Sequence, residues 1–380
     1  GDKRIVLLQP RRVAARAAAA RMAAENGWTL GGEVGYQVRF EDRISDRTRI
    51  AVVTEGILLR RLHDDPFLQD VGAVIFDEFH ERNLNSDLAL GMVRQIQQSV
   101  RPDLKIVVMS ATLVLESVAE YLDNCPMIES TGRTYPVEIS YLAPCGREPR
   151  GDLVVRGVQQ VLDRGGGDVL VFLPGLHEIR QAKRALEAAA ERAGCVVLEL
   201  YGDLPLERQA AILEPGSRRR IVLSTNVAET SLTIPGVTAV IDSGWARTLR
   251  YDPRVGLDRL ELTPISQAAA EQRAGRAGRT QPGVCLRLWD DRSQRARPPL
   301  EEPEVRRVDL AGAVLQLLCW IEPDVERFPW FERPRPEALT RARTLLRQLG
   351  AVDDRGVTKL GRRMARLPVH PRLGRLLIEA

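Results

Sequence analysis

An acidic pair closes an apolar run early in the chain, where Asp77 and Glu78 follow Val74-Ile75-Phe76 and precede Phe79 and His80. At the end of a buried strand, one carboxylate can hold Mg²⁺ through water, and its neighbour can accept a proton from an attacking water molecule. Acidic pairs at strand ends are common, so the alternative is a pair of solvated side chains. His80, followed by Glu81-Arg82, favours the chemical interpretation.

A basic cluster lies near residue 275 and could bind phosphate groups. Its residues are Gln272, Arg273, Gly275, Arg276, Gly278 and Arg279. The spacing of three predicts that the arginines lie on nearby faces of a helix beginning near Ala268, with the glycines permitting close approach. Guanidinium groups match the oxygen geometry of phosphates. The alternative is a solvated basic helix end, which rarely contains two interrupting glycines.

Further polar clusters stand where a predicted strand passes into a helix. They are Gln9-Pro10-Arg11-Arg12, Thr54-Glu55-Gly56, Ser110-Ala111-Thr112 and Ser224-Thr225-Asn226. Backbone N–H groups, hydroxyl groups and guanidinium groups at such places can hold phosphates. Each cluster alone is equally consistent with an ordinary helix cap.

Seven short apolar runs position these clusters. They begin at Ile5, Ile50, Ala73, Ile106, Val169, Ile221 and Ala239. Runs without polar alternation are typical of strands buried on both faces, and the residues beyond the carboxyl ends of parallel strands line a ligand crevice. Helices predicted between the runs indicate βαβ crossovers and an α/β fold with two parallel-sheet domains. The polar clusters are therefore predicted to lie side by side along the carboxyl ends of the strands.

The rhythm changes after residue 245. Short alternating segments at Thr248–Tyr251 and Gly256–Leu262 predict a β-hairpin standing off the second domain. Amphipathic segments at Val308–Trp320 and Glu337–Leu349, followed by a short strand pair, predict a winged-helix domain. We expect domains at 1–133, 134–302 and 303–370, with a further helical domain starting at 371–380.

Bulk composition restricts the class of protein. The 380 residues are 44% apolar and 28% charged, with 55 basic residues and a net charge of +4. This is a mild indication of a polyanionic partner. No stretch approaches the roughly 18 apolar residues that span a bilayer, so we expect no membrane partner and a cytoplasmic location. Five scattered cysteines predict neither a disulfide framework nor a zinc site.

Taken in order, these clusters resemble the motifs of the DEAH-box helicases of superfamily two, and in particular their bacterial HrpB branch. The resemblance covers nearly the whole chain. Gln9–Arg12 resembles motif Ia, Thr54–Gly56 motif Ib, Asp77–His80 motif II, Ser110–Thr112 motif III, Phe172–Gly175 motif IV, Ser224–Thr233 motif V and Gln272–Arg279 motif VI. The third letter of motif II is Phe79 rather than the alanine of the family name, which is a variant similar to the HrpB branch.

The resemblance implies two RecA-like domains of the P-loop NTPase type that close on ATP and Mg²⁺ while single-stranded RNA, or DNA, crosses both. It implies catalytic roles for Asp77, Glu78, His80, Gln272, Arg276 and Arg279, with Asp77 and Glu78 holding the metal. It implies nucleotide contacts from Arg21, Ser110, Thr112, Thr230, Trp245, Arg273 and Gly275. It implies nucleic-acid contacts from Gln9, Pro10, Arg11, Arg12, Thr54, Glu55, Gly56, Pro174, Gly175, Ser224, Thr225, Asn226 and Thr233.

One departure from the family keeps the function open. The Gly-Lys-Thr phosphate loop of the family would precede Ile5 and is not in this sequence, so we expect one sheet edge to be exposed. Gly1 is not an initiator methionine, and residues 371–380 begin a further predicted helix, so we expect both chain ends to be truncations. The leading hypothesis is a monomeric 3′-to-5′ RNA helicase core driven by ATP. The alternatives are a nucleic-acid-binding module without hydrolysis, and a nucleoside triphosphatase stimulated by DNA.

Overall fold

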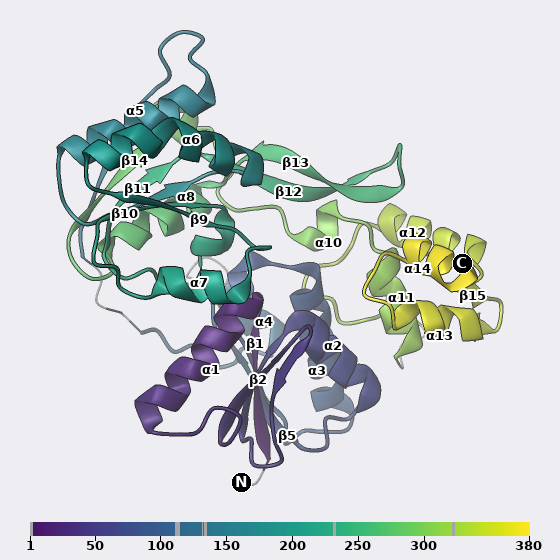
Figure 1. Cartoon of the computed structure of the whole chain (residues 1–380). Coiled ribbons are helices and arrows are strands. Elements are labelled where there is room, and N and C mark those ends of the chain that lie inside the picture. Colours follow the sequence, from purple (N-terminus) through teal and green to yellow (C-terminus); the bar gives the residue numbers. More distant parts are fainter. Residues whose placement is uncertain (1–2, 111–114, 131, 133–134, 231–232, 321–323) are drawn as a thin grey trace. The chain divides into compact units, whose positions relative to one another are not determined.

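The computed structural model describes residues 3–110, 115–130, 132, 135–230, 233–320 and 324–380. Its contacts divide the chain into two compact units (Figure 1). The first unit comprises Gly1–Ile128, Leu249–Arg259 and Glu302–Ala380, and the second comprises Glu129–Thr248 and Leu260–Glu301. Each unit contains one central six-stranded sheet.

The first sheet has the order β3-β2-β4-β1-β5-β6, in which β3 alone is antiparallel to its neighbour. Its strands are β1 (Arg4–Gln9), β2 (Val34–Val38), β3 (Glu41–Arg43), β4 (Ile50–Thr54), β5 (Val71–Phe76) and β6 (Lys105–Val108). Its helices are α1 (Arg12–Asn26), α2 (Glu55–Asp64), α3 (Leu84–Ser99) and α4 (Leu115–Tyr121).

Side chains that alternate along β1 and β4 build two separate cores. Leu7 and Val52 pack with the alanines of α1, whereas Leu8 and Val53 pack on the other face with leucines of α2 and α3. Figure 1 accordingly shows α1 on one face of the sheet and α2 and α3 on the other. This burial on both faces explains why the strands lack polar alternation.

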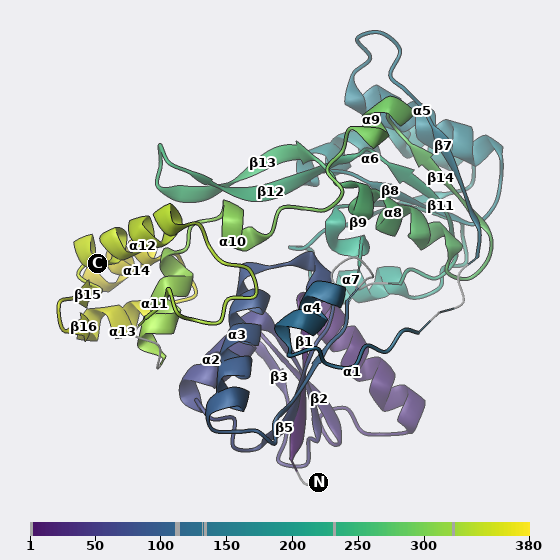
Figure 2. The same ribbon diagram turned by 180° about the vertical axis from the view of Figure 1, so that it is seen from behind.

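The second sheet is parallel throughout, with the order β7-β14-β11-β8-β10-β9. Its strands are β7 (Val137–Tyr141), β8 (Asp168–Phe172), β9 (Val196–Leu200), β10 (Arg220–Ser224), β11 (Val237–Asp242) and β14 (Gly283–Arg287). Figures 1 and 2 show α5 (Arg150–Asp163) and α6 (Leu176–Arg192) on one face, and α7 (Leu206–Leu213) and α8 (Gln267–Gly275) on the other. The short helix α9 (Asp291–Arg295) follows β14.

The C-terminal part of the first unit is helical with a small wing. It contains α10 (Glu304–Arg307), α11 (Ala311–Cys319), α12 (Pro336–Gln348), β15 (Val352–Asp353), β16 (Gly356–Val357), α13 (Lys359–Ala365) and α14 (Pro371–Glu379). The antiparallel pair β15–β16 is the wing that the sequence predicts. Among the described residues, none of the helices combines the length and apolar character needed to cross a bilayer.

All seven predicted strands are confirmed, and so is the parallel α/β fold. The sequence did not predict β2, β3, β7 and β14. Gly35 interrupts the apolar sequence pattern of β2. Glycine is needed at this position because a Cβ there would lie 2.1 Å from the Arg43 carbonyl oxygen. β7 and β14 contain polar or charged residues, including the buried Arg287, which pairs with Glu271. Their patterns therefore do not resemble buried strands.

The predicted hairpin is formed by β12 (Trp245–Asp252) and β13 (Leu257–Pro264). Its outer residues 249–259 group with the first unit, and the rest of the hairpin groups with the second. Backbone oxygens there accept hydrogen bonds from C-terminal arginines, with Arg307 bonding Leu249 and Arg372 bonding Gly256.

Candidate active site

The acidic pair lies at the carboxyl edge of the first sheet, as the sequence predicts. Asp77 follows β5, and its Oδ2 accepts a 2.5 Å hydrogen bond from Nε2 of Gln9 at the end of the neighbouring β1. Its Oδ1 accepts from the backbone N–H of Glu78 at 2.8 Å. Burial raises the pKa of Asp77, while these two hydrogen bonds act in the opposite direction.

The geometry suits a metal ion that is held mainly through water. The single amide oxygen of Gln9, Oε1, is buried without a hydrogen-bond partner in the described structure, and it lies beside the Asp77 carboxylate. Such an acceptor can receive a hydrogen bond from a metal-bound water. No group of three or more His, Cys, Asp or Glu residues forms a metal cage within the described part of the chain. Two carboxylates supplemented by water match the preference of Mg²⁺.

Glu78 and His80 lie together beyond Asp77. His80 Nε2 is 3.4 Å from Glu78 Oε2, and Glu78 adopts a left-handed backbone conformation with φ of 51°. Two backbone hydrogen bonds join this loop to β6, because Met109 N–H donates to Phe76 and Phe79 N–H donates to Met109. Ser110 therefore follows directly on the segment that supports the acidic loop, while Thr112 is outside the described residues.

The motif Ia and Ib residues occupy the same edge. Gln9 and Thr54 are partners in the β1–β4 register. Arg11 Nη2 lies 3.2 Å from Glu81 Oε1, so a predicted nucleic-acid contact is tied to the acidic loop. Glu55 points inward, and its carboxylate accepts hydrogen bonds from Asn83 and Ser86 at 3.0 and 2.7 Å. Gly56 is exposed with open space around it.

The other predicted residues of the first unit are more solvated. Pro10 and Arg12 are half-buried at the start of α1. Arg21 has a side chain that is 77% exposed and pairs with Glu25 one helical turn away. An ion pair at this exposure contributes little to stability, so Arg21 can reorient.

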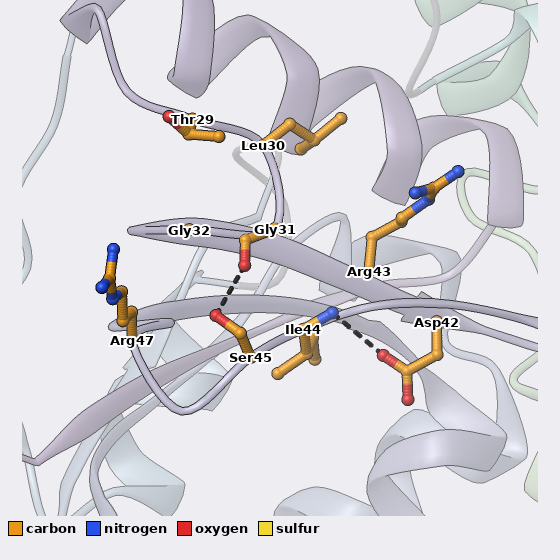
Figure 3. A pocket seen from close by; sticks show the side chains of 9 residues that line it. All are labelled: Thr29, Leu30, Gly31, Gly32, Asp42, Arg43, Ile44, Ser45 and Arg47. Atoms are coloured by element: carbon orange, nitrogen blue, oxygen red, sulfur yellow. Dashed lines mark hydrogen bonds between the residues drawn. The ribbon is translucent and has the colours of Figure 1, made fainter.

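A pocket of the first unit lies at the opposite edge of its sheet. Figure 3 shows this cavity of about 490 Å³ beside Gly31 and Gly32, which precede β2. Ser45 Oγ donates to the Gly31 carbonyl at 2.6 Å, and Arg43 and Arg47 lie on opposite sides of the cavity. The arginines do not converge, so this pocket offers no phosphate site comparable to the carboxyl edge.

In the second unit, the motif VI cluster differs from the predicted continuous helix. Helix α8 ends at Gly275, and a single 3₁₀ turn covers Arg276–Gly278, so Arg276 and Arg279 lie beyond the helix. Arg276 donates to the carbonyl oxygens of Glu229 and Thr230, and Arg279 donates to Thr233 Oγ1. Motifs V and VI are thus joined directly within this unit.

Arg273 lies inside the second unit rather than on its surface. Its 1% exposed side chain pairs with Glu229 at 2.8 Å and with the fully buried Asp242 at 2.9 Å. Burial alone would lower the pKa of this guanidinium, but the two carboxylates hold the pKa above its usual value. Arg273 consequently supports the motif V segment, whereas Gln272 is half-buried and Gly275 is exposed.

Motif V residues differ in their exposure. Ser224 is fully buried and its Oγ donates to the Thr225 carbonyl, which means that its hydroxyl holds the turn. Thr225 is half-buried, Asn226 is exposed, and Thr230 is 5% exposed. Asn226 is therefore the best placed of these side chains for an external ligand.

Two arginines that the sequence did not single out lie beside predicted residues. Arg150 stacks over the ring of Trp245 at 4.0 Å from its centroid. Arg247 covers Gly175 at the start of α6 and pairs with Glu178 at 2.9 Å, and Pro174 is half-buried next to it. A Cβ at Gly175 would lie 2.7 Å from Arg247 Nε, so glycine permits this approach. No local pattern around Arg150 could have indicated its contact.

Comparisons with known proteins agree with these motifs. Residues 2–121 match the DEAD/DEAH box helicase family, 154–281 the helicase conserved C-terminal domain, and 342–369 the winged-helix form of the helicase associated domain HA2. The Escherichia coli ATP-dependent RNA helicase HrpB is 42% identical over 99% of this chain and 47% of its own length. An ATP-dependent RNA helicase HrpA homolog of Haemophilus influenzae is 41% identical over 98% of this chain and 29% of its own length.

Solved structures give the same result. The chain superposes on the crystal structure of the Escherichia coli DEAH/RHA helicase HrpB with a TM-score of 0.92 and 40% identity, covering 100% of this chain and 48% of that one. The chain thus spans less than half the length of these relatives. Its ordered motifs, matched domains and fold show that the chain belongs to the DEAD/DEAH box helicase family.

Proposed function

We propose that this chain is the core of an ATP-dependent 3′-to-5′ RNA helicase that couples ATP hydrolysis to translocation along single-stranded RNA. The observation that carries the proposal is the arrangement at the carboxyl edge of the first sheet. There the Asp77 carboxylate is fixed by Gln9, and Arg11 of the adjacent motif is paired with Glu81 of the acidic loop. The similar proteins named as ATP-dependent RNA helicases support this choice of reaction.

In this proposal, Asp77, with the uncommitted oxygen of Gln9 beside it, would hold Mg²⁺ through water, and the bound ion would supply positive charge to the phosphates of ATP. Glu78, adjacent to His80, accepts the proton of the attacking water. Gln272, Arg276 and Arg279 stabilise negative charge on the transferred phosphoryl group. Arg276 and Arg279 would exchange their present hydrogen bonds to motif V oxygens for bonds to phosphate.

The remaining predicted residues would contact either the nucleotide or the nucleic acid. Trp245, with Arg150 already on its ring, would stack on a base from one side, and Ser110 and Thr112 would contact the nucleotide. The strand ends at Thr54, Gly56, Pro174 and Asn226 would contact phosphates and sugars without reading sequence. Domain limits at 133, 302 and 370, a monomeric state and a cytoplasmic location belong to the same proposal.

Strand displacement by the complete protein tests the direction and the type of strand. We expect unwinding of a duplex with a 3′ single-stranded RNA overhang and none with a 5′ overhang. Equal activity on both overhangs would contradict the assigned direction. Stimulation of hydrolysis by DNA alone would favour a DNA-stimulated nucleoside triphosphatase, and binding without any hydrolysis would favour a binding module.

A further inference from the structure

The acidic loop has an unusual backbone that its own residues do not explain. Glu78 and Arg82 both adopt left-handed conformations, with φ of 51° and 50°, on either side of the 3₁₀ turn Phe79–Glu81. Left-handed residues other than glycine are unfavourable by about 1 kcal/mol or more and persist only where surrounding contacts impose them. Those contacts come from a distant part of the same unit.

Aromatic packing fixes the first half of the turn. The Phe79 side chain is 1% exposed, and its ring meets the ring of Phe331 edge-on, with 5.3 Å between centroids. Phe331 in turn packs edge-on against Tyr121 at 5.2 Å. Phe79 stands where the family name has alanine. The contact with Phe331 therefore depends on the motif II residue in which this chain differs from the family name.

Charge and hydrogen bonding fix the second half of the turn. Arg82 Nη2 lies 2.9 Å from the buried Asp87 and 3.2 Å from Glu332, and its guanidinium covers the Phe331 ring at 4.4 Å. Glu304 both donates a hydrogen bond to this turn and accepts one at its end. Its N–H donates to the Arg82 carbonyl at 3.1 Å, and its carboxylate accepts from Leu84 N–H at 2.9 Å.

The segment that carries Phe331 and Glu332 is itself anchored. A Cβ on Gly91 of α3 would lie 2.5 Å from the Phe328 ring, so this glycine admits Phe328 against the helix. Tyr121 OH donates to the Pro329 carbonyl at 2.5 Å, and Trp330 Nε1 donates to the Val325 carbonyl at 2.9 Å. Glu332 also pairs with Arg306. The segment therefore presents a fixed surface to the acidic loop.

We propose that Phe331 and Glu332 are positioning residues for ATP hydrolysis, acting through Phe79 and Arg82 to hold the Asp77 and Glu78 carboxylates in their reactive geometry. This inference rests on the proposed function. It assigns the segment that precedes α12 a role in the reaction rather than in packing alone. Movement of the C-terminal helices during the cycle would then reach the carboxylates through these two contacts.

The test uses the complete protein with Phe331→Ala, Phe331→Tyr and, as a matched control, Phe67→Ala, which alters a 42% exposed phenylalanine of the same unit. Misplacement of catalytic groups lowers turnover more than binding, so we expect kcat of Phe331→Ala to fall about tenfold or more while KM for ATP changes less than about twofold. Phe331→Tyr retains the ring and should restore kcat, and Phe67→Ala should match the unaltered protein. The combined loss of Phe79→Ala and Phe331→Ala should be smaller than the product of the two separate losses, because both variants remove the contact between these two rings.

Hydrogen exchange of the amides from Asp77 to Leu84 supplies a readout that does not depend on activity. We expect exchange there to rise about fivefold or more in Phe331→Ala, with α1 unchanged. If Phe331→Ala does not fold, Glu332→Gln compared with the exposed Glu326→Gln provides the same test through Arg82.

Unchanged kcat and unchanged exchange in folded Phe331→Ala would overturn the inference, as would multiplicative losses in the double variant. If loop exchange rises but Glu78→Gln does not reduce hydrolysis, the proposed function fails while the positioning contact stands.

Discussion

Glu55 lies at the start of α2, where Asn83 and Ser86 donate to its carboxylate. Burial raises the pKa of Glu55 to about 7, and the carboxylates of Glu304 and Glu81 add to the increase. The folded pKa lies above the unfolded value, so the protonated form favours folding. This contribution is complete at low pH and is lost as the pH rises through about 7.

Replacing Glu55 with glutamine should therefore stabilise the protein at high pH. The neutral amide can accept the same two hydrogen bonds without the buried charge, so the gain in unfolding free energy should grow from near zero at pH 5 to about 1–3 kcal/mol at pH 8.5. Urea unfolding across this range measures it, with the exposed Glu116→Gln as control. A pH-independent difference would contradict the predicted ionisation.

Arg273 should have a large effect on stability. Its removal leaves Asp242, which is fully buried, and Glu229 without their shared cation. Breaking a buried pair in this way costs about 3–5 kcal/mol, so Arg273→Ala should destabilise the second unit by that amount. The control is Arg295→Ala, which removes an exposed ion pair with Asp291 one helical turn away. Equal loss in the two variants by urea unfolding would show that the buried network is not needed.

At the scale of elements, the two glycines of motif VI differ in how closely the surrounding structure packs against them. A Cβ on Gly278 would lie 2.5 Å from the Tyr135 carbonyl oxygen and 2.8 Å from Val137, whereas a Cβ on Gly275 meets open space. Gly278 thus permits the 3₁₀ turn to lie against the start of β7. At Gly275, by contrast, the described structure contains no packing contact that would exclude a side chain.

Gly278→Ala should lower the unfolding free energy by about 1–3 kcal/mol because backbone must shift to relieve the overlap. Gly275→Ala should stay within about 0.5 kcal/mol of the unaltered protein. Thermal and urea unfolding of the two variants make this comparison. A Gly278→Ala protein as stable as Gly275→Ala would disprove the close approach to Tyr135.

The elements that the sequence predicts are those whose local pattern is sufficient. Strands β1, β4, β5, β6, β8, β10 and β11 are continuous apolar runs, and each is found. Strands such as β2 and β14 contain Gly35 or the buried Arg287, whose partners lie elsewhere in the chain, so periodicity misses them. The end of α8 at Gly275 was missed because the arginine spacing continues beyond it.

The same limit applies to the candidate site. Asp77, Gln9 and Arg11 could be predicted because each follows an apolar run, and the structure brings them together. The contacts of Phe79 and Arg82 with Phe331 and Glu332 could not be predicted, since about 250 residues separate the partners. Nor does the sequence indicate that Ser224 and Arg273 are buried, because burial depends on the packing of other elements against them.

At the scale of the whole molecule, the residues of the hairpin β12–β13 are divided between the two units. Its outer residues 249–259 group with the first unit, although its base and the strands that precede it belong to the second. Asp258 Oδ1 accepts from Asp309 N–H at 2.7 Å, and Asp309 Oδ1 lies 3.1 Å from His370 Nε2. The outer hairpin is therefore attached through Asp309 to the start of α14.

The role of the acidic pair can be measured through RNA-stimulated ATP hydrolysis by the complete protein and its Glu78→Gln variant. Loss of the general base removes a contribution of about 10²–10⁴ in rate, so we expect a fall in kcat of this size with RNA binding retained. Hydrolysis that does not respond to RNA, or that survives Glu78→Gln, would contradict the assignment of the acidic pair as the reactive centre of a helicase.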